Sequence, residues 1–425
     1  MAVHYWIIKL KPSFLVIVFS ISLLLGYVSI GNIKVHASQL LPHPKLAEMQ
    51  SFSLQEKENV TYFGKSKKYQ KNGILVVILR GEPYEIGYAR GTLLGNEIRE
   101  WVTELLYIIK QKSLENSFEE NLLKRRAKEV EEFIPPEYRE ELQGLSAGSG
   151  IGYGVLLVVN VLATISIDVA CTSVVVRTSD ESLLRSRNLD LYDKPTLPAG
   201  LYFYKPTNGH AFVSISHLPG FIGTKTAFNE CGLNIGAHDM SRISKKYQKG
   251  EPNFVLRRQV AQYADSVKGA GQILNKARRC VSQMWLVADS KTAGIYEFNS
   301  EEIAFYEMVD DYLILTNHTR MLNIGGISKS SFDRYNEAKA FLQRHRGEMN
   351  TKKLIDLNRG NEICLTKYPK VKNLHSAIFK ADTLDFWVAN GAPPATRGRW
   401  IGFNLNKELY GRGNDPEPFI VPAVK

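Results

Sequence analysis

The pattern of apolar and polar residues changes at Cys171. Before it, apolar residues recur at helical spacing in GEPYEIGYARGTLLGNEIREWVTELLYIIKQ, a stretch that opens near Pro83, and further helices are predicted over residues 118–133 and after Pro135 and Pro136. After it come short alternating or β-branched runs, namely CTSVVVRT, LLRSRNLDL, LYFYK, AFVSISH, TKTAFN and GLNIGA. The first part is therefore predicted to be helical, and the second to begin as a sheet.

Groups of strands and helices follow to the C-terminus. Strands are predicted in QMWLVADS, AGIYEF, EIAFYEM, YLILTN, DFWVANG and WIGFNL, and helices over residues 254–277 and 331–344. This order predicts an α+β architecture of two sheets covered by helices, with no boundary that splits residues 171–425.

The segment before Cys171 contains further features. Residues 38–69 are polar and mixed, which indicates a loosely held lead-in, and Ile74 to Leu79 reads as a short buried strand. Glycines 144, 148, 150, 152 and 154 match neither GxxxxGK[ST] nor GxGxxG, so we expect them to break the third helix at a bend rather than to bind phosphate.

The first 37 residues differ in kind from the rest. Lys9 and Lys11 precede an apolar run from Phe14 to about Ile30, and small residues at Val35 and Ala37 suit a signal peptidase. This pattern predicts export to the periplasm or the extracellular space. An uncleaved membrane anchor is the alternative, because the run is also long enough to span a bilayer.

Composition narrows the function classes. The chain has 425 residues, 44% of them hydrophobic and 23% charged, which is ordinary for a globular protein. The net charge of +11 favours anionic partners such as a membrane surface or an acidic substrate, but scattered Lys and Arg with no basic helix argue against nucleic acid. The motif SKKYQK, at 66–71 and again at 244–249, is interpreted as two solvated basic loops, with a weak anionic-surface contact as the alternative.

The four cysteines leave several roles open for Cys171. Their wide spacing resembles neither a disulfide framework nor a CxxC metal site, although one disulfide is possible in an oxidising compartment. Cys171 can accordingly be a core residue, half of a disulfide or a nucleophile. A nucleophilic thiol needs a base, and the histidine candidates fall in no local protease signature; they are His210, His217, His238, His318 and His375.

A second source of base is the α-amino group that chain cleavage before Cys171 would release. The short turn SDES predicts a hairpin whose returning strand, SRNLDLY, brings Arg187 and Asp190 beside the Cys171 backbone. A carboxylate there can hold the new amine, and a guanidinium can lower the thiol pKa or bind a carbonyl. The valines after Cys171 would then hold the new terminus at the edge of a sheet.

CTSVVV followed by RNLD resembles the cysteine N-terminal nucleophile hydrolases, specifically the acyl-coenzyme A:6-aminopenicillanic acid acyltransferase family, which is related to acid ceramidase, N-acylethanolamine acid amidase and choloylglycine hydrolase. GEPYEIGYARG, ELQGLSAGSGI, FNECGLNIG, LTNH and DTLDFWVANGAPP are similar to other motifs of that family, in the same order. The resemblance covers residues 74 to 405 approximately.

The resemblance implies a four-layer αββα sandwich and self-cleavage between Ala170 and Cys171. The precursor would comprise a signal peptide or anchor (1–37), a helical N-terminal chain (38–170) and a catalytic chain (171–425), the last two staying paired. Cys171 would be the nucleophile and its amine the base, with Arg187 and Asp190 orienting that terminus and Asn317 donating to the oxyanion. Less firm matches give Arg334 and Asn229 supporting roles.

The implied reaction is hydrolysis or acyl transfer on an N-acyl amide through a thioester at Cys171. The substrate class is an N-acylated amine or amino acid, and no metal or organic cofactor is required. Two alternatives stay open at this point: a secreted or anchored binding protein with this fold and no catalysis, and a Cys–His hydrolase that is never cleaved.

Overall fold

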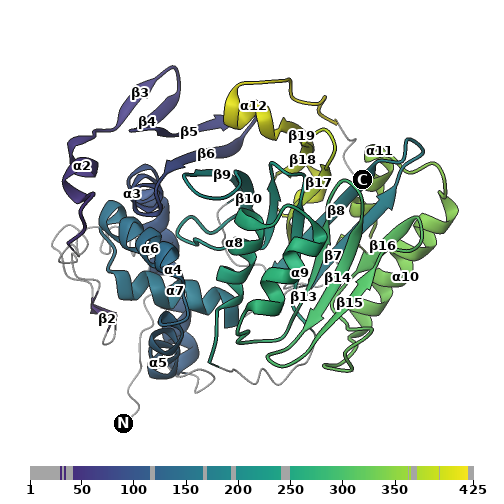
Figure 1. The fold of residues 1–425 in the computed structure, drawn as a ribbon, viewed down its shortest axis with the longest axis horizontal. Coiled ribbons are helices and arrows are strands. Elements are labelled where there is room, and N and C mark those ends of the chain that lie inside the picture. The colour runs from purple at the N-terminus through teal and green to yellow at the C-terminus, as the bar shows by residue number, and fades with distance from the viewer. Residues whose placement is uncertain are drawn as a thin grey trace, which may run out of the picture.

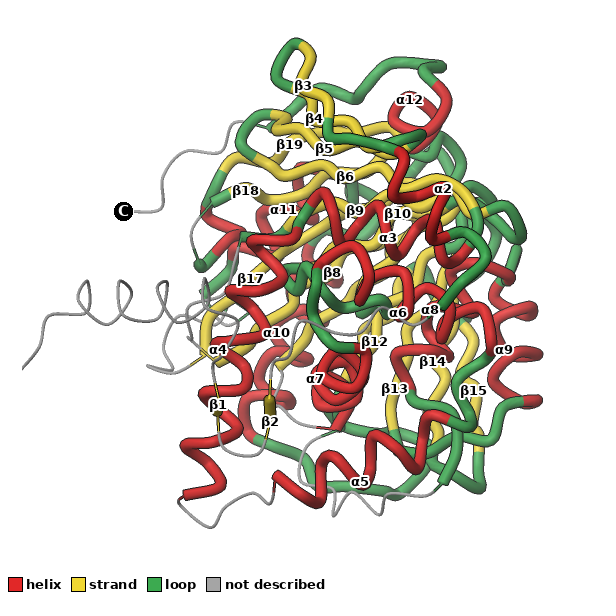
Figure 2. The backbone as a smooth tube through the Cα atoms, turned by 90° about the vertical axis from the view of Figure 1, so that its left-hand side faces the viewer, coloured by secondary structure: helices red, strands yellow, loops and turns green. Residues whose placement is uncertain are grey.

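Two β-sheets stacked face to face lie at the centre of the protein, with helices on both outer faces (Figure 1). The computed structural model describes residues 29–30, 33–34, 42–114, 120–165, 170–192, 198–240, 249–361, 363–364, 371–391 and 393–419. The predicted four-layer αββα architecture is confirmed by this arrangement. Figure 2 views the molecule from the left-hand side of Figure 1, with helices in front of the strands.

The larger sheet combines strands from both sides of Cys171. In sheet order its strands are β15 (Ile303–Glu307), β14 (Ala293–Phe298), β13 (Gln283–Ala288), β12 (Asn234–His238), β11 (Thr226–Asn229), β10 (Phe212–Ser216), β9 (Gly200–Pro206), β6 (Ile74–Gly81), β5 (Ser66–Lys71), β4 (Val60–Phe63) and β3 (Gln55–Lys57). The two groups join where β6 pairs with β9 in parallel, Val76 opposite Leu201.

Residues 38–69 are predicted to be a loose lead-in, but the structure places strands β3 and β4 and the start of β5 there, all in the larger sheet. Asn72 and Gly73 both have positive φ, as a tight two-residue hairpin between β5 and β6 requires. Glu58 and Asn59 do the same between β3 and β4. The turn residues therefore define strands that the polar composition of this segment conceals.

The smaller sheet carries Cys171. Its strands, in sheet order, are β16 (Tyr312–Leu315), β7 (Ala170–Arg177), β8 (Leu183–Tyr192), β17 (Val371–Lys380), β18 (Asp385–Asn390) and β19 (Arg399–Asn404). The predicted β7–β8 hairpin is confirmed. Because β16 lies beside β7, however, the Cys171 strand is internal to the sheet and not at its edge.

Helices cover the two outer faces. Those packed on the larger sheet are α3 (Pro83–Leu93), α4 (Gly95–Leu114), α6 (Pro136–Ser149), α7 (Tyr153–Ile165), α8 (Asn253–Tyr263) and α9 (Val267–Lys276). On the smaller sheet lie α10 (Lys329–Arg344) and α11 (Thr351–Arg359). The remaining elements are β1 (Ser29–Ile30), β2 (Ile33–Lys34), α2 (Leu46–Ser51), α5 (Glu120–Glu131), η1 (Ala395–Arg397) and α12 (Leu405–Tyr410).

Helices α3 and α6 pack with their backbones in close contact. A Cβ atom at Gly144 would lie 2.1 Å from the Tyr84 carbonyl oxygen, and one at Gly148 2.2 Å from that of Tyr88. Gly144 and Gly148 thus lie inside α6 and do not break it, whereas the expected helix-to-helix bend is confirmed just beyond them, where α6 and α7 meet at 119°. The helix ends at Gly150, whose φ of 75° gives a left-handed cap.

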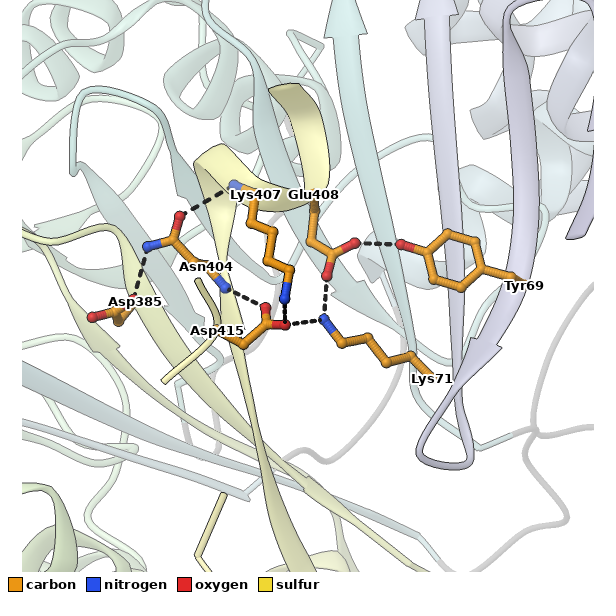
Figure 3. A network of polar contacts seen from close by, with 7 residues as sticks. All are labelled: Tyr69, Lys71, Asp385, Asn404, Lys407, Glu408 and Asp415. Carbon is orange, nitrogen blue, oxygen red and sulfur yellow. Dashed lines mark hydrogen bonds and ion pairs between the residues drawn. The ribbon is translucent and has the colours of Figure 1, made fainter. Parts of the chain in front are cut away.

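Polar contacts at both ends of the molecule bind the segment before Cys171 to the rest of the chain. In the helix layer, Glu141 of α6 forms a buried ion pair with Arg258 of α8, Oε2 to Nη2 at 3.0 Å. At the far end of the sheets, Lys71 of β5 contacts Glu408 and, at 2.8 Å, Asp415 (Figure 3). Residues 66–71 are therefore a paired strand, not the solvated loop expected for the first SKKYQK copy.

The predicted signal peptide or anchor lies outside the described residues except for β1 and β2. Among described helices, no single one is long and apolar enough to cross a membrane. Helices α6 and α7 pass the length and hydropathy criteria only together, as a pair bent by 119°.

Candidate active site

Cys171 lies at the end of the paired region between β7 and β16. The ladder between these strands stops at Leu315 opposite Ser173, so the backbone N–H of Cys171 has no partner on β16. The chain continues from Leu315 to Asn317, whose side-chain Oδ1 accepts a hydrogen bond from that N–H at 2.9 Å. The Cys171 thiol is fully buried, and the Asn317 side chain positions the backbone nitrogen of Cys171.

Arg187 faces the Cys171 thiol from β8. Because Ser173 pairs with Arg187, the two residues lie on the same face of the hairpin as Cys171. Arg187 Nη2 donates to Cys171 Sγ at 3.4 Å and to the Ala237 carbonyl at 2.6 Å. Burial raises the pKa of the Cys171 thiol, and the Arg187 charge opposes this rise.

Arg334 reaches the same point from α10 in the outer helix layer. Its Nη1 donates to the Cys171 carbonyl and to Thr172 Oγ1, the latter at 2.9 Å, and its Nη2 donates to Asn317 Oδ1 at 2.8 Å. One buried guanidinium therefore holds both the strand and the asparagine that meet at Cys171.

Asp190 lies opposite Ala170, across the proposed cleavage point. It is on the other face of β8 from Arg187, where Asn373 of β17 donates to Oδ1 at 2.9 Å. Among the described residues nothing is hydrogen-bonded to Asp190 Oδ2, although it is buried. Burial raises the pKa of Asp190 to about 7, against the opposing charge of Arg334. Within the described residues, this carboxyl group thus has an acceptor without a partner on the residue opposite Ala170.

The structure therefore brings together Cys171, Arg187, Asp190, Asn317 and Arg334, but it does not bring Asn229 to them. Asn229 Oδ1 accepts from the N–H groups of Cys231 and Leu233, and its Nδ2 donates to carbonyls at the end of α8. Its side chain organises the turn between β11 and β12.

Three more polar residues lie at the site, and of these only His238 is indicated by the sequence, as one of five candidate bases. Ser173 Oγ lies 2.8 Å from His238 Nε2, and His238 Nδ1 lies 3.0 Å from the Thr316 carbonyl. The carbonyl of Asp239 accepts from Asn317 Nδ2 at 2.7 Å, and the charge of its carboxylate acts on both Cys171 and Arg187. Asp239 directly follows β12, which is the only signal that the sequence offers for it.

The other thiols and metal-binding side chains add no second centre to this region. All four cysteines are free, and only Cys231 is exposed, with Sγ 3.3 Å from His210 Nδ1. In the parts of the chain that the structure describes, no group of three or more His, Cys, Asp or Glu residues is placed to hold a metal ion.

Proteins from several organisms are similar to this chain. An uncharacterized protein of Archaeoglobus fulgidus is 30% identical over 254 residues, which cover 52% of this chain and 42% of the relative. Protein dcd1A of Dictyostelium discoideum is 28% identical over 296 residues, covering 59% and 64%. The chain thus spans about half the length of the curated relatives it matches. A solved structure of conjugated bile acid hydrolase from Clostridium perfringens is similar at a TM-score of 0.42 with 10% identity, covering 59% of this chain and 97% of that one.

A family model also matches the chain. It is described as acyl-coenzyme A:6-aminopenicillanic acid acyl-transferase, and it matches residues 176–394, just over half of the chain. The matched range begins shortly after Cys171 and contains Arg187, Asp190, Asn317 and Arg334. The chain therefore belongs to the acyl-coenzyme A:6-aminopenicillanic acid acyl-transferase family.

Proposed function

We propose that this protein cleaves its own chain between Ala170 and Cys171, and that Cys171 then acts as the nucleophile of an amide hydrolase or acyltransferase. The convergence of three side chains on Cys171 and Ala170 carries the proposal: Arg187 contacts the thiol, and Asn317 holds the nitrogen that cleavage would free. Asp190, opposite Ala170, has an oxygen that no described residue hydrogen-bonds. Membership of an acyl-transferase family supports the same chemistry.

The cleavage step uses the residues on either side of the bond. The deprotonated Cys171 thiol attacks the Ala170 carbonyl carbon, and the bond to the Cys171 nitrogen breaks as that nitrogen gains a proton. Water hydrolyses the resulting thioester, which gives a carboxylate at Ala170 and restores the thiol. The product is an N-terminal Cys171 with an α-amino group whose ordinary pKa is about 7.7–8.0.

The freed amine then serves as the base for the thiol beside it. Asn317 Oδ1 already accepts from this nitrogen, and Asp190 Oδ2 offers a second acceptor for the ammonium form. Arg187 opposes the burial that raises the pKa of the thiol. In the reaction, thiolate attack on an amide carbonyl releases an amine, and water or a second amine takes the acyl group. Donation from Asn317 Nδ2 to the oxyanion is part of this proposal.

The substrate class we propose is an N-acylated amine or amino acid, with hydrolysis favoured because water is always present. Residues 1–37 would direct the precursor to export, and the two chains would remain paired through contacts such as Glu141–Arg258.

The test is amine release from a panel of N-acyl amides that differ in acyl-chain length. We expect acylated enzyme, detected by intact mass as an adduct that hydroxylamine removes, with Cys171→Ala losing both adduct and activity. Cys231→Ala is the matched control, because this second cysteine contacts His210 and would be the nucleophile of an uncleaved Cys–His enzyme. Activity that depends on Cys231 contradicts the proposal. The absence of any adduct or turnover across the panel favours a binding protein.

A further inference from the structure

Arg185 is a buried cation for which the mechanism has no use. It lies on β8 two residues before Arg187, with 1% of its surface exposed. Among the described residues, Nε, Nη1 and Nη2 all lack a hydrogen-bond partner. Its guanidinium carbon lies 5.6 Å from the centre of the Phe379 ring. Burying a charge without a partner lowers the stability of the fold, so the presence of Arg185 here needs a functional reason.

The Arg185 side chain points to the same place as that of Arg187. Residues two apart on a strand share a face, and both guanidinium groups meet the inner face of β12 at Gly236. A Cβ atom at Gly236 would lie 1.8 Å from Arg185 Nη2 and 2.7 Å from Arg187 Nη1. The absence of a side chain at this position leaves room for the two like charges to converge.

The described residues around Arg185 and Arg187 do not fully compensate the positive charges of the two guanidinium groups. Arg187 Nε and Nη1 also lack partners among the described residues, whereas its Nη2 contacts Cys171 and Ala237. The Asp239 charge acts on Arg187, Lys225 and Arg257, while burial and the neighbouring Arg187 both disfavour the charge on Arg185. An anion between the two guanidinium groups would satisfy several donors and remove their mutual repulsion.

We propose that Arg185 and Arg187 together bind a carboxylate of the substrate, so that the enzyme acts on N-acyl amino acids in preference to neutral amides. This inference rests on the proposed function and adds a residue that determines specificity, Arg185. Planar guanidinium groups suit a carboxylate because they bind it through paired donors.

The placement of Arg187 sets how far the carboxylate lies from the reacting carbonyl. The same guanidinium contacts Cys171 Sγ through Nη2 and converges with Arg185 through Nη1. The carboxylate must therefore lie within about one guanidinium width of the thiol. In an N-acyl α-amino acid, the scissile carbonyl and the carboxylate are one residue apart, about 3.5 Å. We accordingly place the charge on the amine side of the scissile bond.

The experiment compares charged and neutral substrates of the same shape. N-acetyl-, N-octanoyl- and N-palmitoylglycine are each matched with the corresponding glycinamide, and kcat/KM is measured for both. Wild-type enzyme should prefer the carboxylate, and Arg185→Met should reduce kcat/KM for it by about 10- to 100-fold, mainly through KM, with the glycinamides changed little. Arg185→Lys keeps the positive charge but not the paired N–H donors of the guanidinium group, so its kcat/KM for the carboxylate substrates should lie between those of wild type and Arg185→Met.

Arg279→Met is the matched control. Arg279 is also a buried arginine, but it donates to four backbone carbonyls, so its replacement should lower the melting temperature and leave the substrate preference unchanged. Arg185→Met should raise the melting temperature of the ligand-free protein, because it removes an unpartnered buried charge. If Arg185 instead stabilises the fold, Arg185→Met should lower the melting temperature.

The outcomes separate this inference from the proposed function. If wild-type enzyme hydrolyses both substrate types equally, or Arg185→Met leaves their ratio unchanged, the anion site is refuted while amide hydrolysis stands. If no amide is hydrolysed, the proposed function fails, and thermal stabilisation by the acylglycines decides the site. Stabilisation of wild type but not of Arg185→Met supports the site, and equal or absent stabilisation refutes it.

Discussion

The Glu141–Arg258 ion pair offers the sharpest test of how the segment before Cys171 is held. Both side chains are 2% exposed. Besides Glu141, Arg258 donates to the Ile222 carbonyl at 3.0 Å, and its guanidinium carbon lies 3.9 Å from the centre of the Tyr204 ring. Burial raises the pKa of Glu141 even though Arg258 favours its charged form, so the pair is costly to desolvate and both members depend on it.

Glu141→Leu removes the carboxylate and leaves the Arg258 charge buried. Breaking a buried pair in this way costs about 3–5 kcal/mol of unfolding free energy. Adding Arg258→Met removes the stranded charge, and the double variant should recover most of the loss, because replacing both members with apolar groups is often neutral. Measured in a Cys171→Ala background, where we expect the chain to stay intact, a loss of this size shifts the urea midpoint by about 1 M for an m-value of about 3 kcal/mol/M.

The control is Asp333→Ala, which breaks the exposed Lys329–Asp333 pair on α10 and should change the stability by at most about 0.5 kcal/mol. Two results would refute the reasoning. One is a Glu141→Leu midpoint no lower than that of the control. The other is a double variant whose loss equals the sum of the two single losses, since that excludes coupling between the side chains.

Two further predictions follow from the buried residues. Burial raises the pKa of Asp190 from its ordinary 3.8 to about 7, so the stability it contributes is full below about pH 4 and is lost as the pH rises through 7. In the Cys171→Ala background, Asp190→Asn should therefore match its parent at pH 4 and exceed it by about 4 kcal/mol at pH 8, as urea titrations would show; a difference independent of pH is incompatible with this. Gly144→Ala should cost at least about 2 kcal/mol, because its Cβ meets the backbone of α3, whereas Gly154→Ala on exposed α7 backbone should be neutral or stabilising by up to about 1 kcal/mol. Melting curves that rank these two glycine variants the other way would show that the helices are not in close contact.

The sequence pattern predicts the layered fold well where one face of an element is apolar. The β7–β8 hairpin and α10 follow directly from such patterns, because valines and leucines on one face pack on neighbouring layers. Strand β17 could not be predicted in this way, because three of its fully buried residues, Asn373, His375 and Ser376, are polar. These side chains belong to the polar layer around the site, so burial there does not appear as hydrophobicity.

The candidate site is predictable only in part, for a related reason. Cys171, Arg187 and Asp190 lie on one hairpin, whose length and register can be read from the turn between its strands. Asn317 and Arg334 reach Cys171 from separate elements, and only the family resemblance indicated them. Asp239 and Arg185 have no such guide, because their placement depends on how the two sheets stack and on the absence of a side chain at Gly236.

Cleavage of the chain before Cys171 is tested by a denaturing gel of the purified protein with N-terminal sequencing of its fragments. We expect a fragment that begins CTSVVV in wild-type protein and no such fragment in Cys171→Ala. A wild-type protein that stays a single chain yet hydrolyses amides through Cys171 would refute self-cleavage and the amine as base, because no N-terminal amine would then be present.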